Sequence, residues 1–192
     1  MYSNSRIAWR VAHNCIFSQE EVLSMKAMIS DVWSTGLIDD DYHDDRFRKA
    51  EIQGVNSLDN AIFTRLKKYV FAANQAIWKF DLTGYCESDR PHFVRYKRSG
   101  NYDWHIDHDS RSPTRKLTFV VQLSESDSYR GGGLEFFPTI STPSTESIGQ
   151  MGSLIVFPVY YQLIQVMPAN TFAHSCCSSP SKCVFLYVCI FI

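Results

Sequence analysis

The stretch RYKRSGNYDWHID, residues 95–107, decides the fold class, because it joins two strand-like segments through a turn and carries two candidate metal ligands. His105 and Asp107 are two positions apart, and on a strand such residues point to the same side. Before this stretch, residues 92–98 follow a period of two, and after it comes the apolar run of residues 115–124. Both flanks therefore favour strands around a metal-binding pair.

Two imidazoles and one carboxylate on one face of an iron ion leave the remaining positions open for a chelating cosubstrate and O2. A His-x-Asp triplet supplies two of these three ligands. The same triplet also occurs at His43-Asp44-Asp45, inside an acidic stretch with no strand on either side. That second triplet is predicted to be a solvated loop, so His105 and Asp107 are the candidates.

Working outward, a period of two also predicts strands at residues 133–137, 153–161, 171–177 and 182–192. The first half is predicted to be helical instead. Ser18 and Glu21 form a capping-box signature for a helix reaching about Thr35, and a second helix is expected from near Ser57 or Asp59 to a point before Gly84. Helices followed by antiparallel strands predict one α+β domain over residues 1–192, with helical support to about residue 90 and a β core from about residue 91.

Bulk composition is that of an ordinary globular protein, with 45% apolar and 20% charged residues and a formal charge of -1. This charge gives no reason to expect nucleic acid or an anionic membrane as a partner. No secretory signal is evident, and the apolar run of residues 183–192 is too short to cross a bilayer as a helix, so we expect a cytoplasmic protein. The six cysteines contain no CxxC pair and are expected to be thiols, although a disulfide among Cys176, Cys177 and Cys183 stays open.

Residues 95–107 resemble the metal-binding segment of prolyl-4-hydroxylase-type 2-oxoglutarate/Fe(II) dioxygenases, and most of all the bacterial and phage PKHD-type hydroxylases. The resemblance continues in order through residues 115–124, 129–137 and 152–158. It implies a double-stranded β-helix (jelly-roll) core backed by N-terminal helices. It also implies Fe(II), 2-oxoglutarate and O2 as requirements, admits ascorbate, and predicts hydroxylation of a C–H bond in a prolyl or other peptidyl residue or a small amino-acid-like molecule.

The resemblance weakens at the third ligand. Members of the family carry a histidine a few residues after the Phe-Pro pair, whereas residues 159–165 contain none. His174 is the candidate that remains, on a predicted strand. Lys182, eight residues later, is the candidate to bind the far carboxylate of 2-oxoglutarate by a charge-assisted contact, and Tyr96 matches the family tyrosine that hydrogen-bonds this cosubstrate.

Three functional hypotheses follow from these residues. The first is an active 2-oxoglutarate-dependent hydroxylase with iron held by His105, Asp107 and His174. The second is a binding module of the same fold that has lost its iron. The third is a metal enzyme of the cupin type, which ranks last because cupins present more histidines near the first ligand pair and only His108 is available here. The identity of the substrate and the oligomeric state are left open.

Overall fold

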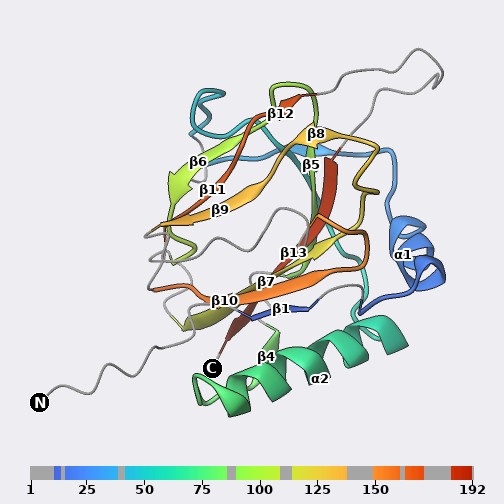
Figure 1. The fold of residues 1–192 in the computed structure, drawn as a ribbon, viewed down its shortest axis with the longest axis vertical. Coiled ribbons are helices and arrows are strands. Elements are labelled where there is room, and N and C mark those ends of the chain that lie inside the picture. The colour runs from blue at the N-terminus through green and yellow to red at the C-terminus, as the bar shows by residue number, and fades with distance from the viewer. Residues whose placement is uncertain are drawn as a thin grey trace, which may run out of the picture.

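The computed structural model describes residues 11–13, 16–38, 42–85, 90–108, 114–137, 149–160, 163–170 and 183–191. Its elements follow the predicted order, with both helices in the first half and a strand-rich second half (Figure 1). The first half contains β1 (Val11–His13), α1 (Gln19–Lys26), β2 (Ser34–Thr35), β3 (Glu51–Gly54), α2 (Ala61–Ala76) and β4 (Gly84–Tyr85). The second half contains β5 (His92–Tyr96), β6 (Tyr102–His105), β7 (Arg115–Gln122), β8 (Arg130–Gly131), β9 (Leu134–Phe137), β10 (Leu154–Pro158), β11 (Leu163–Val166), β12 (Ala169–Asn170) and β13 (Cys183–Phe191).

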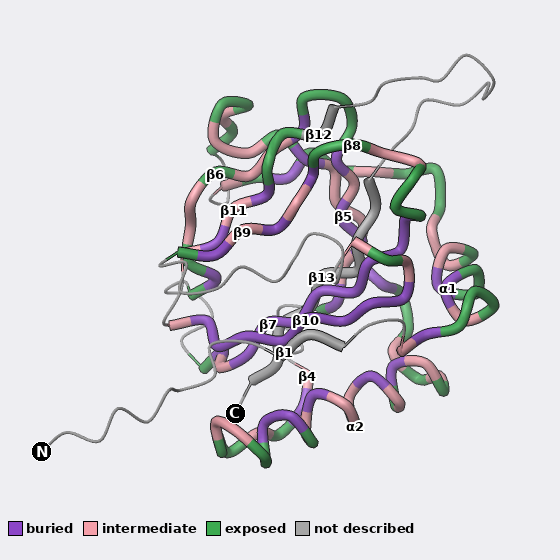
Figure 2. Tube along the Cα trace, in the orientation of Figure 1, coloured by how far each residue is buried: buried purple, intermediate pink, exposed green. Residues whose placement is uncertain are grey.

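A large antiparallel sheet forms the centre of the molecule, with the strand order β1-β10-β7-β13-β5-β3-β2 and β4 paired to β13. The helices cover one face of this sheet, and α2 runs along it in Figure 1. Side chains from both layers form one core, which includes Phe63 and Leu66 of α2 and Phe93 and Phe119 of the sheet, all completely buried. Figure 2 shows this packing: the side of α2 that faces the sheet is buried, and its outer side is exposed.

The other face of the large sheet meets a small sheet with the order β6-β11-β9. A second core lies between the two sheets and contains Val94, Val120, Phe157 and Ile164. Alternation along each strand produces both cores, since Phe119 points to the helices while Val120 points to the small sheet. The two sheets therefore enclose an apolar interior, and the helices support the outer face of the large sheet.

Helix α1 is shorter than predicted. The capping box is present, because Glu21 N–H donates to Ser18 Oγ and Ser18 N–H donates to Glu21 Oε2. The helix nevertheless ends at Lys26 and not near Thr35. Past its end, the side-chain amide of Gln53 bonds the chain at Ser30 and Val32. These contacts draw the segment toward β3, so that β2 pairs with β3 where more helix was expected.

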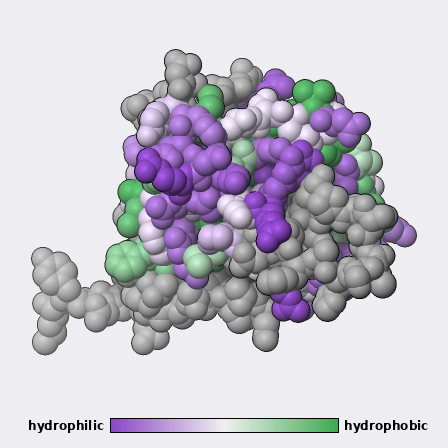
Figure 3. All heavy atoms as spheres, turned by 90° about the horizontal axis from the view of Figure 1, so that it is seen from above, coloured by the Kyte–Doolittle hydropathy of each residue, from purple (hydrophilic) through white to green (hydrophobic). Residues whose placement is uncertain are grey.

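The strands predicted from the period-two pattern are confirmed at β5, β7, β9, β10 and β13. The pairing of β1, β2 and β3 with the large sheet was not predicted. The expected strand at residues 171–177 lies outside the described residues. Within the described part of the chain, no helix has the length and apolar character needed to cross a membrane. The end of the molecule with β6, β8 and β12 shows a mainly hydrophilic described surface (Figure 3).

Candidate functional site

A tight turn after β5 delivers the chain to β6. Gly100 N–H donates to Lys97 O at 2.8 Å, and Ser99 has a positive φ of 61°. A Cβ at Gly100 would lie 2.8 Å from Lys97 O and 2.9 Å from Lys49 O, closer than packed atoms allow. Only glycine lets the turn pass this near to the residue 49 segment. This turn sets where β6, and with it the His105-x-Asp107 pair, begins.

His105 is positioned as a metal-binding imidazole would be. Its Nδ1 lies 2.7 Å from the carbonyl oxygen of Asp103. A carbonyl oxygen only accepts, so Nδ1 carries the proton and Nε2 keeps its lone pair. Nε2 is buried and has no hydrogen-bond partner, and it lies 3.4 Å from Oδ1 of Asp107.

Asp107 completes the pair. Its side chain is 6% exposed and that of His105 is 8% exposed. The buried Arg115, at the start of β7, donates to the backbone carbonyl of Asp107 and so ties this residue to the large sheet. Two donor atoms bound side by side to one metal at about 2.1 Å lie about 3 Å apart. The pair therefore fits one iron ion, and the lone Nε2 is the observation that supports this fit.

The strand beside the pair offers no third ligand. Ile164 of β11 is the register partner of His105 and is 1% exposed. Strand β11 reads Leu-Ile-Gln-Val and carries no histidine or carboxylate. Among the described residues, no group of three histidine, cysteine or acidic side chains is arranged to hold a metal. His174 and Lys182 both lie outside the described residues, so their roles stay predictions.

Tyr96 lies in the interior, and its proposed contact with the cosubstrate stays a prediction. It is 3% exposed and belongs to the core between the two sheets. Its register partner on β13 is Cys183, the residue that follows Lys182 in the chain. The backbone next to Lys182 therefore runs beside Tyr96.

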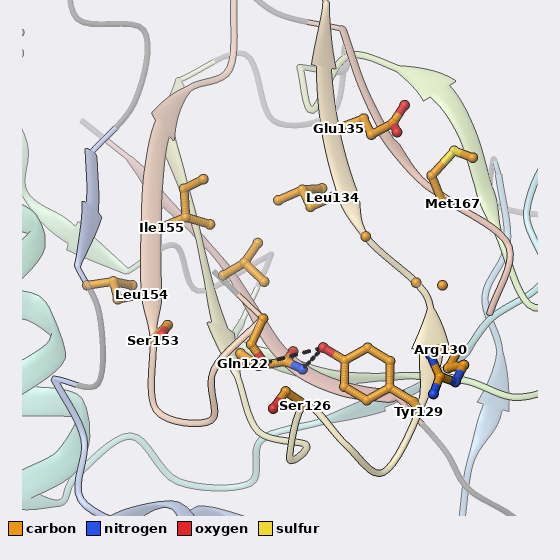
Figure 4. A pocket seen from close by; sticks show the side chains of 15 residues that line it. Gln122, Ser126, Tyr129, Arg130, Leu134, Glu135, Ser153, Leu154, Ile155 and Met167 are labelled. Atoms are coloured by element: carbon orange, nitrogen blue, oxygen red, sulfur yellow. Dashed lines mark hydrogen bonds between the residues drawn. The ribbon is translucent and has the colours of Figure 1, made fainter. Parts of the chain in front are cut away.

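A pocket of about 470 Å³ opens from the space between the sheets. Leu134 and Ile155 point into it from opposite sides (Figure 4), and Val120 lines it as well. Its polar lining includes Gln122, Tyr129 and Arg130. This volume is in the range of pockets that hold small organic ligands.

Gln122 was not singled out by the sequence. It is 2% exposed, its Nε2 donates to Tyr129 Oη, and its Oε1 is buried without a hydrogen-bond partner. An unpaired buried acceptor beside a pocket calls for a donor from a ligand or water. The signal was present in the sequence, since Gln122 is a polar residue at an inward-facing position of an apolar strand. It was missed because a single glutamine near a strand end is common.

The second triplet is a surface loop feature, as predicted. Nε2 of His43 lies 3.0 Å from Oδ1 of Asp45, and the two side chains are 42% and 59% exposed. Hydrogen bonds from the side chain and backbone of Arg46 lower the pKa of Asp44 to about 2. The acidic groups here are satisfied within the loop or by solvent.

Residues 91–185, about half of the chain, match the 2OG-Fe(II) oxygenase superfamily. The chain belongs to this superfamily. The match spans β5 to the start of β13, and so includes His105, Asp107, the small sheet and the strands β5, β7 and β10 of the large sheet. No curated protein matches the chain significantly.

Solved structures of oxygenases share the fold. A prolyl-4-hydroxylase from Pseudomonas putida is 16% identical, with a TM-score of 0.70 over 95% of this chain and 92% of that one. The viral collagen prolyl hydroxylase of Paramecium Bursaria Chlorella virus-1, solved with 2-oxoglutarate, is 16% identical, with a TM-score of 0.65 over 96% and 97%. A prolyl hydroxylase from Trichoplax adhaerens, solved with a hypoxia inducible factor peptide fragment, is 18% identical, with a TM-score of 0.65 over 97% and 84%.

At these identities the structural likeness establishes the fold, which is the double-stranded β-helix that the sequence predicted. The large sheet and the small sheet are its two halves. Membership of the superfamily makes Fe(II), 2-oxoglutarate and O2 the cofactor and cosubstrates, and makes the family activity an oxygenation. Which residues of this chain hold them is a separate question.

Proposed function

We propose that this chain is a hydroxylase in which His105, Asp107 and His174 hold Fe(II), while Tyr96 and Lys182 bind 2-oxoglutarate. The buried Nε2 of His105, free of any hydrogen bond and 3.4 Å from Asp107, is the observation that carries the proposal. Its substrate class is a prolyl or other peptidyl residue or a small amino-acid-like molecule.

When bound, Fe(II) allows O2 to convert 2-oxoglutarate to succinate and CO2 while the second oxygen atom enters a C–H bond of the substrate. The protein contributes position and shielding. His105 presents a lone pair from a fixed tautomer, and Arg115 holds the backbone of Asp107. The burial of the His105 and Asp107 side chains keeps bulk water away from a reactive centre.

Two features support the cosubstrate residues. Tyr96 is buried between the sheets, and Lys182 immediately precedes its register partner on β13. A lysine there would hold a carboxylate as a point charge, without the two parallel bonds of an arginine.

The test is metal binding followed by turnover. Titration calorimetry with Co(II), which resists oxidation better than Fe(II), is expected to show one site in the purified protein. His105→Ala and Asp107→Ala should each weaken Co(II) binding by more than about tenfold, whereas His43→Ala, the matched histidine of the surface triplet, should not change it. Absence of Co(II) binding in the unaltered protein contradicts the proposal.

Turnover is measured as succinate released from 2-oxoglutarate with Fe(II) and ascorbate, in the presence of proline-containing peptides or free amino acids. His174→Ala is expected to abolish both Fe(II) binding and succinate release. Lys182→Ala is expected to raise the KM for 2-oxoglutarate while leaving Co(II) binding intact. Full activity of the His174→Ala protein would remove this residue from the site.

The second candidate function is a binding module without catalysis. Ile164 favours it, because the strand facing His105 contributes an apolar side chain and no ligand. Such a module would bind 2-oxoglutarate, yet release no succinate with any peptide or amino acid tested. The His174→Ala measurement separates the two candidates, since a module has no third ligand to lose.

A further inference from the structure

We propose that Tyr102 and Arg48 form a stack that positions the imidazole of His105 for metal binding. This inference rests on the proposed function, because the imidazole is taken to be a metal ligand. Tyr102 and Arg48 touch no metal in this scheme, so both are positioning residues. The stack joins the metal-binding strand to a segment more than fifty residues earlier in the chain.

The ring of Tyr102 lies against the ring of His105. Their centroids are 3.4 Å apart and their planes differ by 15°. The hydrogen bond from Nδ1 fixes the tautomer of His105, and the stacked ring restricts the plane in which the imidazole can turn. The two constraints together aim Nε2 toward Asp107.

A register irregularity makes this contact. Residues three apart on a regular strand point to opposite faces, so Tyr102 and His105 should not meet. Here Ile164 pairs with His105 and Val166 pairs with Tyr102. The paired residues are thus two positions apart on β11 but three positions apart on β6, so β6 contains one extra residue. An extra residue of this kind re-aims side chains and is frequent near active sites. The irregularity therefore brings Tyr102 to the face of His105.

Arg48 covers the remaining face of Tyr102. Its guanidinium carbon lies 4.4 Å from the centroid of the ring, and His105 already occupies the other face. Nη1 of Arg48 donates to Leu37 O at 2.6 Å, while its Nε is buried with no hydrogen-bond partner. A Cβ at Gly36 would come within 3.0 Å of that Nε, so the glycine leaves room for the guanidinium.

The surroundings of Arg48 indicate that its positive charge interacts with the aromatic ring of Tyr102. Its hydrogen bond goes to a carbonyl, and no carboxylate in the described part of the chain forms an ion pair with it. A guanidinium on an aromatic face is attracted by the negative charge of the ring's π system, more strongly where it is partly removed from water. The π cloud of Tyr102 thus compensates a charge that would otherwise be costly to bury.

The rest of the segment holds this stack in place. Phe47 contacts the edge of Tyr102, with centroids 5.8 Å apart and planes at 78°. Asp103 N–H donates to Phe47 O at 2.7 Å, and Lys49 and Asn101 exchange backbone hydrogen bonds. In Figure 1 this segment lies beside β6. Residues 47–49 therefore hold in place β6, the strand that carries His105.

Calorimetry with Co(II) tests the proposal on Tyr102→Leu, Tyr102→Phe and Trp104→Leu proteins. Tyr102→Leu is expected to weaken Co(II) binding about ten- to one-hundredfold and to change the visible absorption of bound Co(II). Tyr102→Phe keeps the ring and should retain both. Trp104 is the matched control, because it is an aromatic residue of the same strand whose ring contacts Phe137, away from His105.

Arg48→Met and Arg48→Lys test the contribution of the guanidinium that stacks on Tyr102. Both should weaken Co(II) binding several-fold, since a lysine ammonium lacks the flat face that stacks on a ring. Thermal unfolding of the metal-free proteins shows whether each variant is folded. Binding by Tyr102→Leu equal to the unaltered protein, or loss by Trp104→Leu as large as by Tyr102→Leu, overturns the positioning role alone. If the unaltered protein binds no Co(II), the proposed function fails, and the positioning role falls with it.

Discussion

Gly152 shows how a single residue sets the approach of two segments. It has a φ of +83°, and a Cβ there would lie 2.3 Å from Phe17 O. Gly152→Ala is therefore expected to destabilise the protein by roughly 2 kcal/mol or more, through backbone strain and the clash with a carbonyl. Chemical denaturation measures the loss. The matched control is Gly54→Ala, where nothing lies within 4 Å of the added carbon, and a comparable loss there would refute the steric explanation.

At the scale of elements, α2 begins at a specific side-chain contact. Asn60 adopts an extended conformation, and its Oδ1 accepts from Phe63 N–H at 3.1 Å. Asn60→Ala is expected to cost about 1 kcal/mol of unfolding free energy, because one helix N–H loses its partner. The exposed Gln75 near the other end of the helix serves as control, and Gln75→Ala should change stability by less than about 0.5 kcal/mol. Equal midpoints of thermal unfolding for the Asn60→Ala and unaltered proteins would contradict the capping role.

The elements also show where local sequence patterns stop being informative. Ser18 and Glu21 correctly predicted the start of α1, since a capping box is formed by two residues only three positions apart in the sequence. The end of α1 depended on Gln53, which is distant in the sequence. No local pattern encodes that contact, so the helix was predicted too long.

At the scale of the whole molecule, lowering the pH should reduce the stability of the folded protein in two stages. Burial, together with the charge of Arg48, lowers the pKa of His92 from 6.5 to about 4. Between these values the unfolded chain binds the proton and the folded protein does not, so stability falls as the pH drops from about 6.5 toward 4. His92→Gln should flatten this part of the stability profile, measured as unfolding midpoint against pH. An unchanged slope would show that another group titrates there.

The second acid stage involves carboxylates. Hydrogen bonds with Ser18 and Arg65 lower the pKa of Glu21. Burial raises the pKa of Glu51, but hydrogen bonds from Lys97 and Arg95 outweigh this effect, so that the pKa of Glu51 is lowered as well. Both groups are stabilising when ionised, so their contribution is present above the ordinary value of 4.5 and is lost as the pH falls through the lowered pKa. This loss should survive in the His92→Gln protein.

The division into one domain is also a prediction at this scale. Helices α1 and α2 share a core with the large sheet, so helix and strand signals are expected to be lost in one cooperative transition. Circular dichroism in the near and far ultraviolet measures both during heating. Two separated transitions would show that the helical half and the β half are independent units.

The sequence alone determined the α+β class, the close spacing of His105 and Asp107, the strands β5, β7, β10 and β13 of the large sheet, and the surface position of His43. Each depends on spacing within a few residues, which the chain's own geometry converts into shared faces and turns. Only the tertiary structure brought Arg48 to Tyr102, placed residues 47–49 along β6, and set Ile164 opposite His105. These contacts join residues far apart in sequence, and they are decided by which side chains can pack between two sheets. The pair proposed to bind the metal can thus be recognised in the sequence, whereas the contacts that hold His105 in place, and the residue that faces it, depend on the folded chain.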